Sequence, residues 1–276
     1  MIRNIIVTIV VLMSFVFNFS FAQPGDYTLV NQKPGWKIYK KGSGDDVIYV
    51  QEIDINKARV SFIDKGSNSS GAFLKFPMLT MWNSSSSVAY SISNGSFFEQ
   101  TTGIYDGIAY PYKSSSKVKT YGWSTQRDIN SLKMLVLSYD TSSGSYKYTA
   151  KVLPYSKSVF DQVKNTDILT ALNINFNKYS IGNIGRTYIG VKSDYSGNDY
   201  VYILNGKSLT QTEAKDELLN YYIDENNMIM FDGSGSTQLF FKNSANSTEY
   251  IYGCASIYPK ICGEDKRQIP QAIAIL

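Results

Sequence analysis

Short segments in which apolar and polar residues alternate recur along most of this 276-residue chain, and they limit the folds that it can adopt. Alternation with a period of two puts apolar side chains on one face of a β-strand and polar side chains on the other. Turn clusters rich in Gly, Ser, Asn and Asp separate the segments. We predict strands within the segments 46–55, 58–64, 87–98, 132–140, 145–153, 186–193 and 199–206, with the first two pairing as a hairpin across Asn56 and Lys57.

Helical signals are fewer than strand signals. The best begins at Thr210, where Glu213 follows three residues later and the two residues match a capping box. Ala214 and Leu218 then fall on one face of the predicted helix. Aromatic residues make up 14% of the chain, including 22 tyrosines, and this suits pleated, half-buried surfaces. Because the sequence has no repeat, long linker or break in composition, we predict an α+β fold: one mixed domain over residues 23–276, with a β-rich sheet core and a few helices.

Residues 1–22 have the features of a secretory signal peptide. Arg3 gives a basic start, an apolar stretch follows from Ile5 to about Phe17, and Ser20-Phe21-Ala22 fits a cleavage site before Gln23. The alternative is a retained membrane anchor, but the apolar run is shorter than the ~20 residues that a spanning helix needs. We therefore expect a secreted or periplasmic protein with no stable membrane insertion after cleavage.

The charge and the histidine count exclude several function classes. The formal net charge of +4 is mild and the lysines are scattered, so nucleic acid is not an expected partner. The chain contains no histidine, which rules out Ser-His-Asp and Cys-His catalysis and the usual His-based zinc sites. Acid–base chemistry would have to come from carboxylates, lysines or tyrosines. We predict no cofactor and identify no metal site, since no recognised calcium-loop spacing is present, but the sequence leaves metal dependence open because Asp and Asn oxygens could hold a calcium.

Cys254 and Cys262 are the only two cysteines of the chain. In an exported protein, two cysteines so close in sequence are most simply explained by a local disulfide. A catalytic thiol is the alternative, but it would lack a histidine base.

A glycine- and hydroxyl-rich segment, Asp232–Thr237, interrupts two apolar runs near the C-terminal end. Glycines allow close approach of a ligand and a positive φ, and successive backbone N–H groups can bind an anion. Asp232 could act as an acid or base, or orient a sugar hydroxyl. The segment is not a nucleotide P-loop, since it lacks the Gly-Lys-Ser/Thr sequence. The local pattern alone favours a different explanation, a tight hairpin in which Asp-Gly makes the turn.

Four stretches of the chain resemble, in order, motifs of the phosphodiester glycosidase family. "FDGSGSTQLF" is similar to the family's Asp-Gly-Gly-Gly-Ser stretch, and "SISNGSFF" (91–98) to its Asn-Gly-Gly-aromatic-Phe motif. "GRTYIGV" (185–191) resembles the Arg-Thr-x-Ile-Gly strand, and "KRQIPQAIAIL" (266–276) the closing Arg-x-x-Pro strand. Together they span about two thirds of the chain. Ser96 and Ser234 stand where the family has a second glycine, so the approach to a ligand is narrower here.

The resemblance implies cleavage of a bond between a sugar and a phosphate. Arg186 and Arg267 would bind the anion through their guanidinium forks. Asp232 would be the first catalytic carboxylate and Glu99 a second, with Asp106 a further candidate. The resemblance also implies a set of substrate-binding residues at the strand end and in the glycine segment, namely Asn94, Gly95, Ser96, Gly233, Ser234, Gly235, Ser236 and Thr237.

Two functions remain open from the sequence, beside a third interpretation in which the chain is an exported, hairpin-rich structural domain with no ligand. The first is a secreted hydrolase of glycosyl phosphodiesters or related glycoconjugates, whose partner is a glycan or sugar-phosphate substrate. The second is a non-catalytic carbohydrate-binding or cell-surface protein on the same scaffold. The sequence does not specify the sugar, the group beyond the phosphate, the stereochemical outcome or the oligomeric state.

Overall fold

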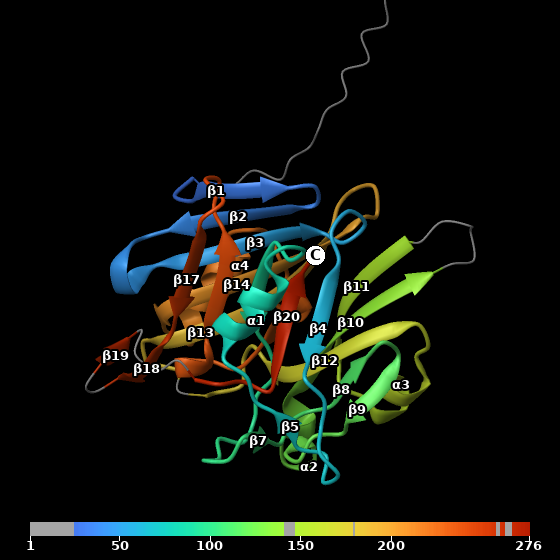
Figure 1. The fold of residues 1–276 in the computed structure, drawn as a ribbon. Coiled ribbons are helices and arrows are strands. Elements are labelled where there is room, and N and C mark those ends of the chain that lie inside the picture. Colours follow the sequence, from blue (N-terminus) through green and yellow to red (C-terminus); the bar gives the residue numbers. More distant parts are fainter. Residues whose placement is uncertain (1–24, 141–146, 179, 258–259, 263–266) are drawn as a thin grey trace, which may run out of the picture.

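Two antiparallel β-sheets packed face to face form the centre of the computed structural model, which describes residues 25–140, 147–178, 180–257, 260–262 and 267–276 (Figure 1). Short helices cover the outer faces, so the predicted α+β fold with a β-rich core is confirmed. The signal peptide predicted at residues 1–22 lies outside the described residues. Within those residues, no helix has the length and apolarity needed to cross a membrane.

The larger sheet has eleven strands, and every neighbouring pair in it is antiparallel. Its long central strands bring the middle of the chain beside the N-terminal strands. In spatial order the strands are β1 (Thr28–Lys33), β2 (Trp36–Lys41), β3 (Ile48–Asp54), β14 (Asp199–Leu209), β13 (Ile184–Ser193), β15 (Met228–Met230), β12 (Thr166–Asn173), β10 (Leu132–Asp140) and β11 (Lys147–Pro154), with β8 (Tyr112–Ser114) and β9 (Lys117–Thr120) attached at β12.

The smaller sheet has five strands, again all antiparallel, and two further pairs stand apart from it. Its spatial order is β17 (Thr248–Tyr252), β16 (Gln238–Lys242), β6 (Ser91–Asn94), β20 (Gln271–Ile275) and β4 (Val60–Asp64). The separate pairs are β5 (Phe73–Leu74) with β7 (Tyr105–Asp106), and β18 (Cys254–Ile257) with β19 (Lys260–Cys262).

The hairpin predicted across Asn56 and Lys57 is wrong. Strand β3 pairs with β2 and β14 in the larger sheet, whereas β4 pairs with β20 in the smaller sheet. The connection between β3 and β4 therefore carries the chain from one sheet to the other. The C-terminal strand β20 completes the smaller sheet between β6 and β4, so both ends of the described chain contribute to the sandwich.

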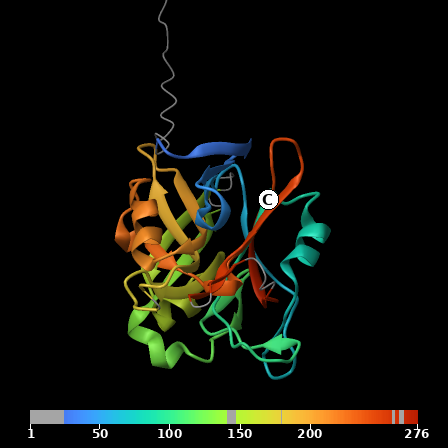
Figure 2. The ribbon, with the colours of Figure 1, turned by 90° about the vertical axis from the view of Figure 1, so that its left-hand side faces the viewer.

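The two longest helices lie on opposite outer faces of the sandwich, as Figure 2 shows. Helix α4 packs against β13 and β14 of the larger sheet, and α1 against β6 and β16 of the smaller one. The capping box predicted at Thr210 and Glu213 is confirmed at the start of α4. The helices are α1 (Met78–Ser85), α2 (Thr125–Asp128), α3 (Lys157–Gln162) and α4 (Gln211–Leu219), with short 3-10 turns η1 (Gly44–Asp46), η2 (Ile129–Ser131), η3 (Glu225–Asn227) and η4 (Ser234–Ser236).

A chain of buried polar side chains, which we call the polar seam, joins the two sheets inside the apolar core. Gln51 of β3 accepts a hydrogen bond from the Trp36 indole at 3.0 Å and donates to Ser93 of β6 at 3.1 Å. Ser93 donates to Asn205 of β14 at 3.0 Å, and Asn205 donates to Thr187 of β13 at 3.2 Å. A buried polar group without a partner would cost free energy, so these bonds fix the register of one sheet against the other.

We expect replacement of Thr210 by alanine to lower the free energy of unfolding by about 1 kcal/mol, because the N-cap hydroxyl is lost. In the folded protein that hydroxyl accepts a hydrogen bond from the backbone N–H of Glu213 at 3.1 Å. Thr210→Ser keeps the hydroxyl and should remain close to wild type. Urea denaturation of the three proteins measures the difference, and equal stability of the Ala and Ser variants would contradict the assigned cap.

Candidate active site

Asn94, the last residue of β6, connects the smaller sheet to the glycine segment and to the larger sheet. Its side-chain amide donates to the main-chain carbonyl of Asp232 at 2.8 Å. Its side-chain carbonyl accepts from Thr187 Oγ1 at 2.7 Å and from the backbone N–H of Gln238 at 3.1 Å. Asn94 is buried, and its bond with Thr187 places it at the end of the polar seam. Its bond to the Asp232 carbonyl holds the start of the glycine segment in place.

The glycine segment passes between the sheets, so the hairpin alternative for it is wrong. It leaves β15 of the larger sheet, turns through η4 and enters β16 of the smaller sheet. The left-handed conformation in this segment belongs to Ser234, with φ of +59°, whereas Gly233 has φ of −126°. Glycines are required around Ser234 instead: a Cβ on Gly185 or Gly253 would lie 2.3 or 2.5 Å from its carbonyl oxygen.

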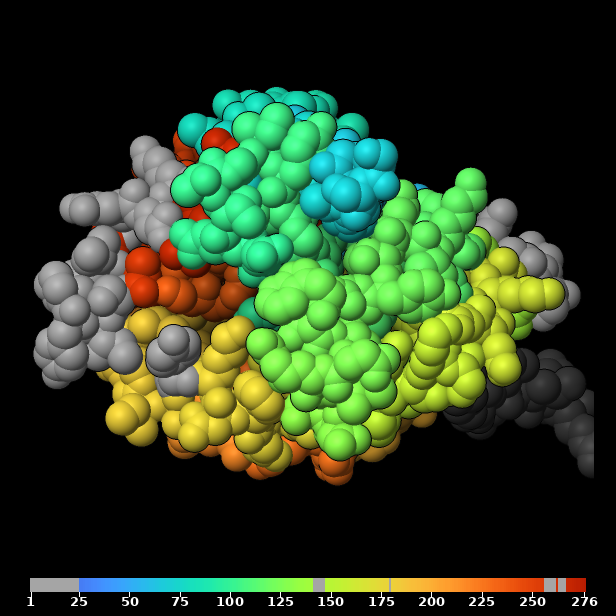
Figure 3. All heavy atoms as spheres, turned by 90° about the horizontal axis from the view of Figure 1, so that it is seen from below, coloured from blue at the N-terminus to red at the C-terminus, as the bar shows by residue number. Residues whose placement is uncertain are grey.

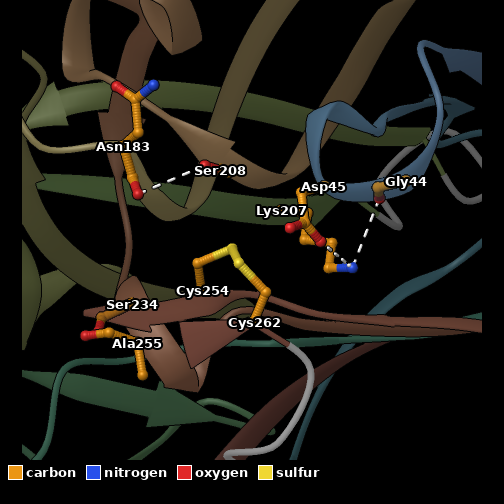
Figure 4. Close-up of a disulfide and its surroundings, with 9 residues drawn as sticks. All are labelled: Gly44, Asp45, Asn183, Lys207, Ser208, Ser234, Cys254, Ala255 and Cys262. Carbon is orange, nitrogen blue, oxygen red and sulfur yellow. Dashed lines mark hydrogen bonds and ion pairs between the residues drawn. A yellow bond between two sulfur atoms is a disulfide. The ribbon is translucent and has the colours of Figure 1, made fainter. Parts of the chain in front are cut away.

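A disulfide hairpin braces the same segment. Cys254 and Cys262 are bonded across β18 and β19, so the predicted disulfide is confirmed. The hydroxyl of Ser234 donates to the carbonyl of Ala255, the neighbour of Cys254, at 2.7 Å (Figure 4). Ser234 thus anchors the turn to the disulfide hairpin.

Asp232 presents a partly buried carboxylate at the entrance of the glycine segment. Its Oδ1 accepts from the backbone N–H of Gly233 at 3.0 Å, and its own N–H donates to the Gly95 carbonyl at 3.3 Å. Burial raises the pKa of Asp232, and a hydrogen bond with Ser236 and the charges of Lys178 and Arg267 oppose that rise. The burial effect is the largest, so the carboxyl holds its proton to a higher pH than an exposed aspartate does.

Lys178 and Arg267 are the two cations whose charge acts on Asp232. The Lys178 Nζ lies 4.0 Å from the centroid of the Phe97 ring, and burial lowers the pKa of this lysine. Arg267 Nη1 donates to Ser236 Oγ at 3.4 Å. The sequence analysis identified Arg267 but missed Lys178, which follows an asparagine in a loop and belongs to no recognisable motif.

A second carboxylate, Asp128 at the end of α2, faces the same group of residues. It accepts a hydrogen bond from the buried Tyr110 hydroxyl at 2.9 Å and pairs with Arg127 at 3.2 Å. Its charge acts on Lys178, and Tyr110 also lies within the electrostatic influence of Asp232. Although burial opposes the shift, bonds from Arg127, Ser124 and Tyr110 lower the pKa of Asp128, so it stays ionised. Asp128 belongs to none of the motifs recognised in the sequence.

Arg186 lies behind the site. Its guanidinium donates to the main-chain carbonyls of Leu209, Lys178 and Gly182 at 3.0 to 3.1 Å, and burial lowers its pKa. Neighbouring residues of a strand point to opposite faces, so Thr187 reaches Asn94 while Arg186 points away from it. Arg186 therefore supports the loop that carries Lys178, and direct contact of Arg186 with an anion stays a prediction.

The other predicted residues of β6 and its continuation lie partly beside Asp232 and partly apart from it. Gly95 adjoins the glycine segment, since its carbonyl accepts from the Asp232 N–H, whereas the backbone N–H of Ser96 donates to Gln271 Oε1 of β20 at 2.8 Å. Glu99 is exposed, and no described contact joins it to Asp232. Asp106 is buried in an ion pair with Lys75 at 3.1 Å, and this pairing gives it a structural role.

Figure 3 shows a hollow in the face of the molecule that lies below the sheets. The orange and red atoms of the C-terminal part lie recessed between green atoms of the segment around residues 95–130 and yellow atoms around residues 170–190. Of the predicted set, the structure brings together Asn94, Gly95, Asp232, the segment 233–237 and Arg267.

The fold is shared with several solved structures, of which three are described here. The catalytic domain of zebrafish N-acetylglucosamine-1-phosphodiester alpha-N-acetylglucosaminidase, auto-inhibited by its pro-peptide, matches with a TM-score of 0.54 and 14% identity over 90% of this chain and 87% of that one. A putative exported protein from Burkholderia pseudomallei matches with a TM-score of 0.53 and 11% identity over 84% of this chain and 74% of that one. A hypothetical protein from Synechocystis matches with a TM-score of 0.50 and 10% identity over 92% of this chain, which spans 64% of that protein.

No protein-family model and no curated protein sequence matches the chain. At identities of 10 to 14%, the three structures demonstrate a shared fold and provide no evidence about activity. The resemblance to the glycosidase family noted from the motifs is therefore supported at the level of the fold.

Ser234 offers a test of the conformation of the glycine segment. Ser234→Ala should lower the free energy of unfolding by about 1 kcal/mol, because the bond to Ala255 is lost while the left-handed backbone remains. Ser234→Gly also loses the bond but gains about 1 kcal/mol from the removal of Cβ, so it should stay near wild type. Urea denaturation distinguishes the two variants. An alanine variant as stable as the glycine variant would rule out the left-handed assignment.

Proposed function

We propose that this protein is an exported hydrolase that cleaves the bond between a sugar and a phosphate in glycosyl phosphodiesters. The observation that carries this proposal is the position of Asp232, a partly buried carboxylate on which the charges of Lys178 and Arg267 both act. The fold shared with a glycosidase catalytic domain supports the proposal, and the disulfide between Cys254 and Cys262 supports export.

The two cations would bind the phosphate. Phosphoryl oxygens carry the negative charge of the substrate, and cleavage adds charge to the oxygen that leaves the sugar. Lys178 and Arg267 would stabilise the charge on the phosphoryl oxygens and the charge on the leaving oxygen. Their electrostatic interactions are strong because the site is partly shielded from water. Arg267 adds a planar fork of donors that matches phosphate oxygens.

Asp232 would act as the general base. Water attacks the anomeric carbon, and its proton passes to the Asp232 carboxylate. The bond from the anomeric carbon to the phosphate oxygen breaks with its electron pair on that oxygen, giving a free sugar and a phosphomonoester. Because a phosphate needs little protonation to leave, one carboxylate is sufficient. A raised pKa makes that carboxylate a stronger base near neutral pH.

Asp128 and Asn94 would keep these groups in position. Asp128 stays ionised and holds the Tyr110 hydroxyl, while its charge favours the protonated form of Lys178. Asn94 fixes the main chain of Asp232. Both are positioning residues, since Asp128 acts through Tyr110 and Lys178 and Asn94 acts through the main chain of Asp232.

Substitutions of the two central residues test the activity. We expect Asp232→Asn to reduce kcat/KM for N-acetylglucosamine-1-phosphodiester analogues about a thousandfold, and Lys178→Met about a hundredfold to a thousandfold. Lys164→Met, which changes an exposed lysine elsewhere, serves as the control. Absence of turnover by the wild type across several sugars, or turnover by Asp232→Asn at the wild-type rate, would refute the proposal.

The raised pKa of Asp232 predicts a pH-dependent stability difference. Its folded pKa exceeds its unfolded pKa, so the folded protein binds more protons between the two values and its unfolding free energy falls as pH rises through that window. Asp232→Asn lacks this effect. The variant should therefore gain stability relative to wild type as pH rises from about 4 through the raised pKa, and the gain should then level off. Urea titrations between pH 4 and 8, with the exposed Asp216→Asn as control, measure it; a gain independent of pH would contradict the assignment.

A further inference from the structure

A cavity of about 430 Å³ opens between the two sheets beside β4, the edge strand of the smaller sheet, and it is separate from the candidate active site. One wall comes from the β3–β4 connection and the start of β4, and the opposite wall from β10, β11 and β12. In Figure 1 these strands end on the right, whereas the disulfide hairpin that anchors the glycine segment lies on the left. The volume is within the range of ~300–1,000 Å³ that is typical of small-molecule sites.

The wall formed by the larger sheet presents two aromatic rings, one apolar side chain and one carboxylate on the same face. Leu137 and Tyr139 of β10 alternate onto this face, and the register places Tyr148 of β11 opposite Tyr139 and Asp167 of β12 opposite Leu137. The centroids of the two tyrosine rings lie 6.3 Å apart. Leu137 and Tyr148 pack against the main core, so this face points inward, between the sheets.

The carboxylate of Asp167 keeps acceptor capacity in this position. Asp167 is half-buried, and the described residues give its carboxylate one hydrogen bond, from the backbone N–H of Ser116 at 3.4 Å. An ionised carboxylate can accept about four. The charge of Asp167 acts on Lys113, but the amine of Lys113 donates to two main-chain carbonyls at α3. Lone pairs of the Asp167 carboxylate are therefore available to a ligand.

Hydrogen bonds of the protein itself fix the shape of the cavity. Ser115 and Ser116 form the two-residue turn between β8 and β9, with φ of +51° and +61°, a left-handed conformation that favours Gly or Asn. The hydroxyl of Ser116 accepts from the backbone N–H of Thr166 at 3.1 Å, which ties the turn to β12. The backbone N–H of Tyr148 donates to Asn56 Oδ1 at 3.1 Å, which ties β11 to the β3–β4 connection. The cavity is thus preformed, as small-molecule sites usually are.

Arg59 supplies a cation at the wall formed by the smaller sheet. Two backbone hydrogen bonds of 2.9 Å to Leu276 hold its main chain in place. Among the described residues, the guanidinium of Arg59 forms no ion pair, either with Asp167 or with another carboxylate. The buried side chains of Ile55 and Val60 line the cavity beside it. Two opposite charges are therefore separated by a partly apolar cavity.

We propose that this cavity is a second binding site, which takes a short peptide of about two or three residues with free termini and an apolar or aromatic side chain. The guanidinium of Arg59 would bind the terminal carboxylate through two parallel hydrogen bonds, and Asp167 would accept from the terminal ammonium. The rings of Tyr139 and Tyr148 would pack against the side chain of the peptide.

The separation of the two charges favours a peptide over a single amino acid. In a free amino acid the ammonium and the carboxylate are attached to one carbon. In a dipeptide a peptide unit separates the two α-carbons by about 3.8 Å, and this suits two protein charges that are too far apart to pair with each other. The inference goes beyond the proposed hydrolase function and does not depend on it.

Calorimetry with the dipeptide alanyl-phenylalanine and its blocked forms tests the site without any turnover. The wild type should bind the free dipeptide at least tenfold more tightly than the C-terminal amide or the N-acetyl form, because each blocked form loses one charge-assisted contact. N-acetylglucosamine, which carries no charge, should not compete. Absence of binding of the free dipeptide, equally tight binding of the doubly blocked form, or competition by the sugar would overturn the proposal.

Two substitutions assign the ends of the peptide. Arg59→Met should lower the affinity for the free dipeptide about tenfold and leave the affinity for the amide unchanged. Asp167→Asn should likewise weaken binding of the free dipeptide and leave the affinity for the N-acetyl form unchanged. Lys151→Met, which removes an exposed cation from the outer face of β11, is the matched control for Arg59→Met. Equal losses for free and blocked peptides would contradict the assigned contacts. If a variant does not fold, the comparison of free and blocked peptides on the wild type decides alone.

Discussion

The buried side-chain amide of Asn94 is the interaction on which the candidate site depends. It bonds to Asp232 from the smaller sheet, to Thr187 of the larger sheet and to Gln238, the residue that follows the glycine segment. Each of these groups would be costly to leave unsatisfied in the core, so the amide permits only one relative position of the two sheets and the segment between them. The position of the Asp232 carboxylate follows from that restraint, because the main chain of Asp232 is held directly.

The electrostatics of the site combine opposing effects. Burial disfavours the charge on Asp232, while Lys178, Arg267 and Ser236 favour it, and burial has the larger effect. The same burial lowers the pKa of Lys178, although Asp232 and Asp128 oppose that change. A partly shielded carboxylate and a partly shielded ammonium are thus kept close to each other at some cost in stability, as is usual where a protein performs proton transfer or binds an anion.

The features that depend on local sequence pattern were predicted correctly. Most strands, the capping box of α4 and the disulfide follow from periodicity, cap chemistry and cysteine spacing, and all are present. The hairpin predicted at Asn56-Lys57 is absent, and so is the alternative hairpin that the local pattern favoured at Asp232-Gly233, because a turn pattern does not reveal that its two strands belong to different sheets. Lys178 was not predicted for a related reason: it is far from Asp232 in the sequence, and only the folding of the chain brings the two residues together. The motif located Arg186, but the pleat of β13 turns its side chain towards the loop behind the site.

The passage of the glycine segment from one sheet to the other has a mechanical consequence. The Asp232 carboxylate is attached to both halves of the sandwich, through β15 on one side and β16 on the other. A substitution that weakened the Asn94 restraint and shifted one sheet over the other would displace the carboxylate relative to Lys178, whose main chain is bonded to Arg186 of β13 and to Gln211 of α4. The distance between the Asp232 carboxylate and the Lys178 ammonium therefore depends on how the two sheets are aligned. A core substitution far from both groups would change that distance if it shifted one sheet relative to the other.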